Sequence, residues 1–282
     1  MRTVAEHRQY LREQAARLPN PAAGFFGPGS MAWRLNREAL LGLVVLRALF
    51  LQVAHPKVAQ GVAEHSDFRR RPFARALATL RAQQTIVFGT AEQASEALLR
   101  IYARHVVVRG DGYEANDPSL LFWVYATLID SMFFAYRTFL PDLSAQEWAV
   151  FYEEGKLFGR LIGIPNEQMP RTKADFDAWM RAVLGDESEI TVLSDGYEIG
   201  RSLLRMPVAV VQPLTAFISA GTLPPRLRAE FGLGWGAGRQ RAFDALARGL
   251  RALLRYTPEV LHVAPAYWLA LRRAAKPISN LK

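Results

Sequence analysis

The sequence predicts a mostly α-helical protein, because helix-start signals are dense, apolar residues recur at helical spacing, and strand patterns are few. Half of the 282 residues are hydrophobic and 22% are charged, so the chain can bury a sizeable core and is not disordered. No internal repeat or low-complexity tract divides it. We therefore expect one compact domain over residues 1–282.

Start and stop signals set the expected helices. Gly89 and Gly110 stand where two helices should end. The start signals are two capping boxes, Thr90–Gln93 and Ser144–Glu147, and the pair Asp117-Pro118. The segment Pro19–Ser30, rich in proline and glycine, is expected to be irregular. The expected helices are 4–17, 36–54, 56–64, 72–88, 91–109, 118–139, 145–162, 172–184, 196–204, 207–220, 224–230, 239–255 and 258–274.

Cysteine and charge exclude several classes of protein. The chain has no cysteine, so it has neither disulfides nor thiolate metal sites, and a metal would need other ligands. The net charge of +9 comes without any nucleic-acid-binding motif, so we expect no nucleic-acid partner. The five histidines are the residues to follow: His7, His55, His65, His105 and His262.

Three apolar stretches resemble membrane spans. Ala39–Ala54, Leu120–Tyr136 and Leu203–Thr222 are each short or interrupted by a charge or by prolines. We expect them to be buried helices of a soluble core, with peripheral membrane contact as the alternative. The N-terminus is charged and lacks the apolar run of a signal peptide, which predicts a cytoplasmic location.

The helix that follows Thr90 places a histidine on its apolar face. His105 continues a stripe formed by Ala94, Leu98 and Ile101 at spacings of four and three residues. One interpretation is a core histidine that hydrogen-bonds a carbonyl or carboxylate. The other is a metal or haem ligand, since neutral imidazole is the commonest metal ligand.

Arg75 and Thr79 lie one turn apart on the expected helix 72–88. A buried guanidinium needs an anionic partner. A salt bridge to Asp67, Glu92 or Asp130 would supply one. Alternatively, Arg75 faces a cofactor carboxylate or positions bound oxygen.

Two more charged residues and one histidine stand in apolar surroundings. Asp130 and Arg47 are the lone acid and base of their apolar runs, and we expect them to pair across the core. Asp130 could instead orient a ligating histidine. His55 precedes Pro56, where a helix ends and a side chain can cap the next one or line a site.

Several common enzyme motifs are missing from the sequence. It contains no dinucleotide-binding glycine fingerprint, phosphate-binding loop, zinc-protease motif or nucleophile elbow. The adjacent acids Glu153 and Glu154 would point in different directions from a helix, so they do not form a glycosidase pair. Hydrolase and nucleotide-binding functions are therefore disfavoured.

A set of ordered motifs resembles the MpaB / rubber-oxygenase catalytic-domain family. The resemblance covers residues 24 to 273, leaving helix 4–17 as an N-terminal extension. The motifs that carry it are Phe26–Glu38, Gln52–Pro56, Gly61–Phe68, Val87–Thr90, His105–Gly110, Asn116–Pro118, Trp123–Ser131, Leu223–Arg228 and Phe231–Leu233.

This resemblance implies an all-α, globin-like domain that holds haem b, with additional helices. The proximal motif of latex clearing proteins corresponds to Arg100 and His105, so His105 would hold the iron, with His55 as the competing ligand. Their distal motif corresponds to Arg75, Ala78 and Thr79, which would make Arg75 and Thr79 the catalytic residues.

The chain departs from the family pattern at two positions. Latex clearing proteins have lysine where this chain has Ala78, and Tyr125 replaces a histidine that many members carry.

We therefore hold three hypotheses. The first is a haem-dependent oxygenase that acts with dioxygen on an apolar, isoprenoid or lipid-like substrate. The second is a haem or apolar-ligand binder without turnover. The third is a helical membrane-surface protein whose basic helix Arg239–Arg255 contacts anionic headgroups.

Overall fold

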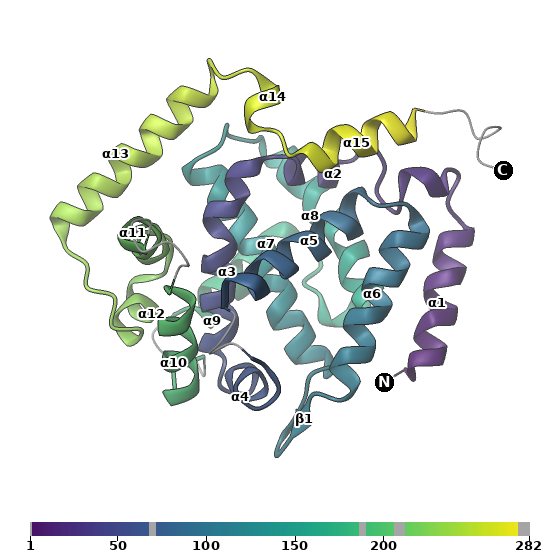
Figure 1. Ribbon diagram of the computed structural model, residues 1–282, viewed down its shortest axis with the longest axis horizontal. Helices are drawn as coiled ribbons and strands as arrows, with labels where there is room; N and C mark the ends of the chain where they lie inside the picture. Colours follow the sequence, from purple (N-terminus) through teal and green to yellow (C-terminus); the bar gives the residue numbers. More distant parts are fainter. Residues whose placement is uncertain (1, 68–71, 186–189, 206–211, 276–282) are drawn as a thin grey trace.

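The computed structural model describes residues 2–67, 72–185, 190–205 and 212–275, with the backbone alone for residues 72–76. In these ranges the chain forms fifteen α-helices, with the long helix α7 at their centre, and its one sheet is a two-stranded hairpin at the edge of the molecule (Figure 1). The all-α prediction is confirmed. The globin-like arrangement and the single-domain boundary remain predictions.

The N-terminal half follows the sequence patterns except around residue 36 and after residue 106. The predicted helix 36–54 is divided, because Glu38 is extended and bridges to Val263. Ser30 starts a separate short helix before this break by accepting a hydrogen bond from the Trp33 amide. The elements are α1 (Val4–Ala16), η1 (Pro21–Ala23), α2 (Met31–Asn36), η2 (Ala39–Leu41), α3 (Gly42–Ala54), α4 (Pro56–His65), α5 (Pro72–Phe88) and α6 (Ala91–Val106).

Helix α6 ends earlier than its apolar pattern predicts. It ends at Val106, and β1 (Arg109–Gly110) pairs with β2 (Tyr113–Glu114) in a tight hairpin. Gly112 turns the hairpin with φ of 72°, a conformation that favours glycine. The prediction that Gly110 ends the helix is wrong, because Gly110 lies in the hairpin, where a Cβ would come within 2.6 Å of the Tyr113 ring.

The predicted helix caps are confirmed in both halves of the chain. The capping boxes at Thr90 and Ser144 and the cap at Asp117 form as expected. The predicted helix 258–274 is divided, because Val263 is extended and bridges to Glu38. Residues 207–211 of the predicted helix 207–220 lie outside the described ranges. The helices are α7 (Pro118–Thr138), α8 (Ala145–Ile162), η3 (Asn166–Gln168), α9 (Lys173–Val183), α10 (Ser194–Leu203), α11 (Gln212–Thr222), α12 (Pro225–Glu230), α13 (Ala237–Leu254), α14 (Glu259–His262) and α15 (Pro265–Ala274).

Helix α7 forms the centre of the main core. Its side chains pack against α3, α8, α9 and α13, with the fully buried Phe133 in edge-to-face contact with Trp148, Phe151 and Phe176. Of the described helices, α7 alone is long and apolar enough to cross a membrane, and 72% of its apolar window is buried inside the molecule. The segment Ala39–Ala54 and α4 pass the same test only together, across a bend of 102°.

The predicted pair between Arg47 and Asp130 is confirmed. Arg47 Nη2 lies 2.7 Å from Asp130 Oδ2, and both side chains are largely buried between α3 and α7. The same guanidinium donates to the Thr222 carbonyl at 2.9 Å and to Ser131 Oγ at 3.0 Å. Asp130 therefore serves Arg47 and does not orient a histidine.

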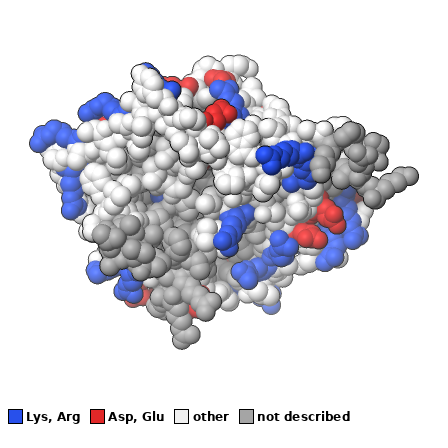
Figure 2. All heavy atoms as spheres, turned by 45° about the horizontal axis from the view of Figure 1, so that its top comes forward, with Lys and Arg blue, Asp and Glu red and all other residues white. Residues whose placement is uncertain are grey.

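The basic helix α13 uses its apolar side to pack on the core. Phe243 and Ala247 are buried there, whereas Leu253, near the end of the helix, is exposed. On the face turned forward in Figure 2, Lys and Arg side chains lie in separate groups among uncharged residues. Membrane contact through this helix remains a prediction.

Candidate functional site

His105 lies in the last turn of α6, at the edge of its buried face. The capping box at Thr90 fixes the start of this helix, and Ala94 and Leu98 are buried, so the helix holds its C-terminal turn against the core. The His105 residue is partly exposed, but its Nδ1 atom is buried and has no hydrogen-bond partner among the described residues. Burial lowers the pKa of His105, so the imidazole is neutral at neutral pH.

Asn116, from the loop before α7, lies against the same turn of α6. Its side chain is 4% exposed, and its Nδ2 donates to the Tyr102 carbonyl at 3.2 Å. The Oδ1 atom is buried and has no hydrogen-bond partner within the described ranges. The Asn116 amide is close enough to the imidazole to raise the pKa of His105 against the larger effect of burial, although no hydrogen bond of full geometry joins them. Sequence reasoning missed Asn116, whose only signal was its place in the Asn116–Pro118 motif.

His55, the competing ligand, has a structural role. It caps α4, and its Nδ1 accepts a hydrogen bond from the Lys57 amide at 3.2 Å. In the neutral ring, this acceptor role places the proton on Nε2, so ligation through Nε2 would cost the cap. Its ring centroid lies 6.1 Å from that of Trp123.

The other predicted site residues lie on α6 and α5. Arg100 lies on the outer side of α6, is 70% exposed and pairs with Glu96. The Arg75 side chain lies outside the described residues, so its predicted partners are untested. Ala78 is exposed, while Thr79 is half-buried and faces a cavity.

The cavity beside Thr79 has a volume of about 240 Å³ and lies between α3, α5 and α7. This volume approaches the lower end of the roughly 300–1,000 Å³ typical of small-molecule sites. Its polar lining includes an anchored amide, because Gln83 Nε2 donates to Asn36 Oδ1 at 2.7 Å. The apolar lining is Ala39, Leu41, Gly42, Val44, Val45, Ala48, Leu49, Leu80, Leu128, Met132, Ala264 and Pro265.

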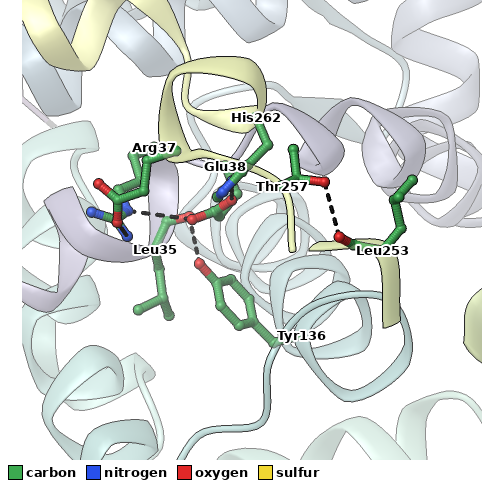
Figure 3. Close-up of polar contacts among 8 residues, drawn as sticks. Leu35, Arg37, Glu38, Tyr136, Leu253, Thr257 and His262 are labelled. Carbon is green, nitrogen blue, oxygen red and sulfur yellow. Dashed lines mark hydrogen bonds and ion pairs between the residues drawn. The ribbon is translucent and has the colours of Figure 1, made fainter. Parts of the chain in front are cut away.

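The segment that joins α14 to α15 closes one side of this cavity. The Ala264 amide donates to the Arg37 carbonyl at 2.7 Å. Glu38 and His262 point toward one another, with His262 Nδ1 2.8 Å from Glu38 Oε2 (Figure 3). Tyr136, also drawn there, donates to the Leu35 carbonyl at 3.0 Å and so ties α7 to the end of α2. The cavity thus combines an apolar interior with a polar rim.

Tyr125, at the position of the family's histidine, is buried in the core. Its hydroxyl has no hydrogen-bond partner among the described residues and lies against Gly155, where a Cβ would come within 2.9 Å of it. Burial raises the pKa of Tyr125 well above its ordinary value, so the phenol remains protonated. This side chain fills space in the core and donates no hydrogen bond there.

The described residues fit a haem, which one histidine can hold, better than a metal ion that needs several protein ligands. Within the described ranges, no group of three His, Asp or Glu side chains is placed to hold a metal ion. A haem would need one neutral imidazole, and the His105 side chain has the fitting chemistry, since its Nδ1 is buried beside an amide.

Comparison with known proteins identifies the family. The model of the family described as ER-bound oxygenase mpaB/B'/rubber oxygenase, catalytic domain, matches residues 33–252. The chain belongs to this family. Membership is consistent with an oxygenase. In this member of the oxygenase family, the match covers α3 to α12, together with His55, Thr79, His105 and Asn116, and leaves out α1 and the cavity-closing segment at Ala264.

Two relatives of this oxygenase-family chain carry the description "uncharacterized protein". One is from Mycobacterium bovis and the other from Mycobacterium tuberculosis. Each is 29% identical over 228 residues, which cover 74% of this chain and 87% of the relative. No solved structure matches the chain.

Proposed function

We propose that this protein is a haem b-dependent oxygenase that acts with dioxygen on an apolar, isoprenoid or lipid-like substrate. The observation that supports it most is His105, a neutral histidine with a buried, unpartnered Nδ1 inside the region that matches the oxygenase family. A second support is the mainly apolar cavity beside Thr79, which suits a hydrocarbon better than a polar substrate.

Each residue has a defined part in this proposal. His105 holds the iron, and the Asn116 amide orients its ring. When bound, the haem supplies the dioxygen chemistry that the side chains of this protein lack. Thr79 faces the substrate cavity, and Arg75 of the same helix is the cationic residue of the distal side. The apolar walls from α3 and α7 exclude water from the substrate.

Removal of the His105 ring tests the proposal. His105→Ala is expected to lose the Soret band of the haem-loaded protein, because no other described histidine combines a free, buried ring nitrogen with a place in the matched region. The matched control is His55→Ala, which should keep the full band and lose only the cap of α4, at a cost of about 1 kcal/mol. A full band in the His105 variant, or protein that stays colourless when haem is supplied, would reject the assignment.

Asn116 is expected to tune the bound haem through His105. Asn116→Ala should weaken haem affinity about 10–100-fold, measured as haem transfer to an acceptor protein, because oriented ligands depend on such outer partners. Asn116→Asp should restore binding and lower the iron reduction potential, since a carboxylate makes the imidazole a stronger donor. If both variants bind haem with the affinity and potential of the unmodified protein, Asn116 does not position His105.

A second candidate function is haem or apolar-ligand binding without turnover. Ala78 favours it, because this exposed residue replaces the lysine of the latex clearing proteins and leaves the distal side with one positive charge fewer. Oxygen consumption by the haem-loaded protein separates the two candidates. Turnover with a polyisoprene, squalene-like or fatty substrate supports the oxygenase, and binding of these compounds without oxygen uptake supports the binder.

A further inference from the structure

A second cavity is lined by a buried arginine for which the described residues supply no acidic partner. This cavity is a depression more open to solvent than the cavity beside Thr79. It has a volume of about 430 Å³ and lies between the C-terminal end of α7, the end of α11, α12 and α13. Arg228 of α12 lines it and is only 8% exposed. No carboxylate of the described residues lies within ion-pair distance of this guanidinium, and burial alone lowers the pKa of Arg228. A buried cation without a counter-charge is costly, so its retention requires an explanation.

The Arg228 guanidinium is held in place, but not all of its hydrogen-bond donors have a partner among the described residues. Arg228 Nη2 donates to the Leu223 carbonyl at 2.8 Å, and the guanidinium carbon lies 4.5 Å from the centroid of the Trp235 ring. The Nε atom is buried and has no hydrogen-bond partner in the part of the chain that the structure describes. An arginine fixed in this way keeps donors available for a planar oxyanion, which it binds through two parallel N–H bonds.

The other arginine of the cavity differs from Arg228. Arg47 also lines the wall, but its donors serve Asp130, Ser131 and the Thr222 carbonyl, so its charge is already compensated. The acidic residue of the wall, Asp244, accepts a hydrogen bond from Gln240 at 2.8 Å. Of the two cations that line this cavity, Arg228 is therefore the one without a described carboxylate partner, while Asp244 keeps its negative charge at the rim.

The other residues that line the cavity are mainly apolar and indicate that the rest of the ligand is apolar. Apolar side chains and backbone from four elements face the space: Phe134, Gly221, Leu223, Pro224, Pro225 and Phe243. From these observations we propose that this cavity is a second ligand site, which binds the carboxylate of an apolar acid through Arg228 and its chain against the apolar walls. The site is separate from His105 and from the cavity beside Thr79, and it does not depend on haem.

Calorimetric titration of the full-length protein with octanoate tests this site. Octanoate should bind, octanol should bind at least tenfold more weakly, and inorganic phosphate should not bind, because the site needs both a carboxylate and an apolar chain. Arg228→Met should weaken octanoate binding at least tenfold, which corresponds to the loss of one charge-assisted interaction. His105→Ala should leave octanoate binding unchanged, which separates this site from the proposed haem site.

Two charge variants at the rim keep the test valid if Arg228→Met does not fold. Gln240→Glu adds a negative charge beside the cavity and should weaken octanoate binding about threefold, whereas Asp244→Asn removes one and should strengthen it by a similar factor. Equal octanoate affinity in all three variants and the unmodified protein would overturn the proposal. So would a lack of octanoate binding, or phosphate binding without octanoate binding.

Discussion

Replacement of Asp130 by alanine is expected to destabilise the protein by about 3–5 kcal/mol, because it leaves the buried Arg47 guanidinium without a counter-charge. Arg47 would keep its hydrogen bonds to Ser131 Oγ and the Thr222 carbonyl, but neither acceptor carries a charge. The cation also lies 4.9 Å from the Phe134 ring, in a core that offers little water. Urea unfolding at neutral pH measures the loss of stability.

The matched control removes both charges. Arg47→Met combined with Asp130→Leu should recover most of the lost stability, since well-packed apolar replacements of buried ion pairs are often neutral or stabilising. Asp130→Asn adds a functional control, because it should leave haem binding intact if Asp130 serves Arg47 and not a ligating histidine. A cost below about 1 kcal/mol for Asp130→Ala would show that the pair is not the counter-charge that Arg47 needs.

Local sequence signals predicted most of the helical fold. A cap is decided by residues within one turn, so Thr90, Ser144 and Asp117 marked helix starts that the structure confirms. The Arg47–Asp130 pair was also predictable, because each residue was the lone charge in an apolar run. Both inferences needed no knowledge of how the helices pack.

Contacts between distant segments account for what the sequence could not predict. The division of the C-terminal helix depends on the bridge between Val263 and Glu38, which are more than 200 residues apart. The buried Oδ1 of Asn116, which has no hydrogen-bond partner among the described residues, becomes visible only when the loop before α7 is placed against α6. Exposure of Leu253 likewise reflects where the packed face of α13 ends, and periodicity alone does not fix that point.

Acidification is expected to destabilise the protein through His7, a residue of the N-terminal extension. His7 is fully buried between α1 and α6, and its ring stacks on Tyr102 with a centroid separation of 3.9 Å. Burial lowers the pKa of His7 to about 4, with a smaller contribution in the same direction from Arg2. Since the unfolded chain protonates near pH 6.5, it binds more protons than the folded chain between pH 6.5 and 4. Stability from this group is therefore complete above pH 6.5 and falls by about 3 kcal/mol by pH 4.

Comparison with His7→Gln isolates this effect from the titration of other groups. Both proteins would be unfolded in urea at several pH values from 7.5 to 4, and the difference in their unfolding free energies should change by about 3 kcal/mol over that range. Release of α1 is the least costly way to hydrate the charged ring, because α1 is joined to the rest of the molecule mainly through α6. Hydrogen exchange should therefore show α1 losing protection first as the pH falls, and parallel pH profiles for the two proteins would exclude His7 as the group responsible.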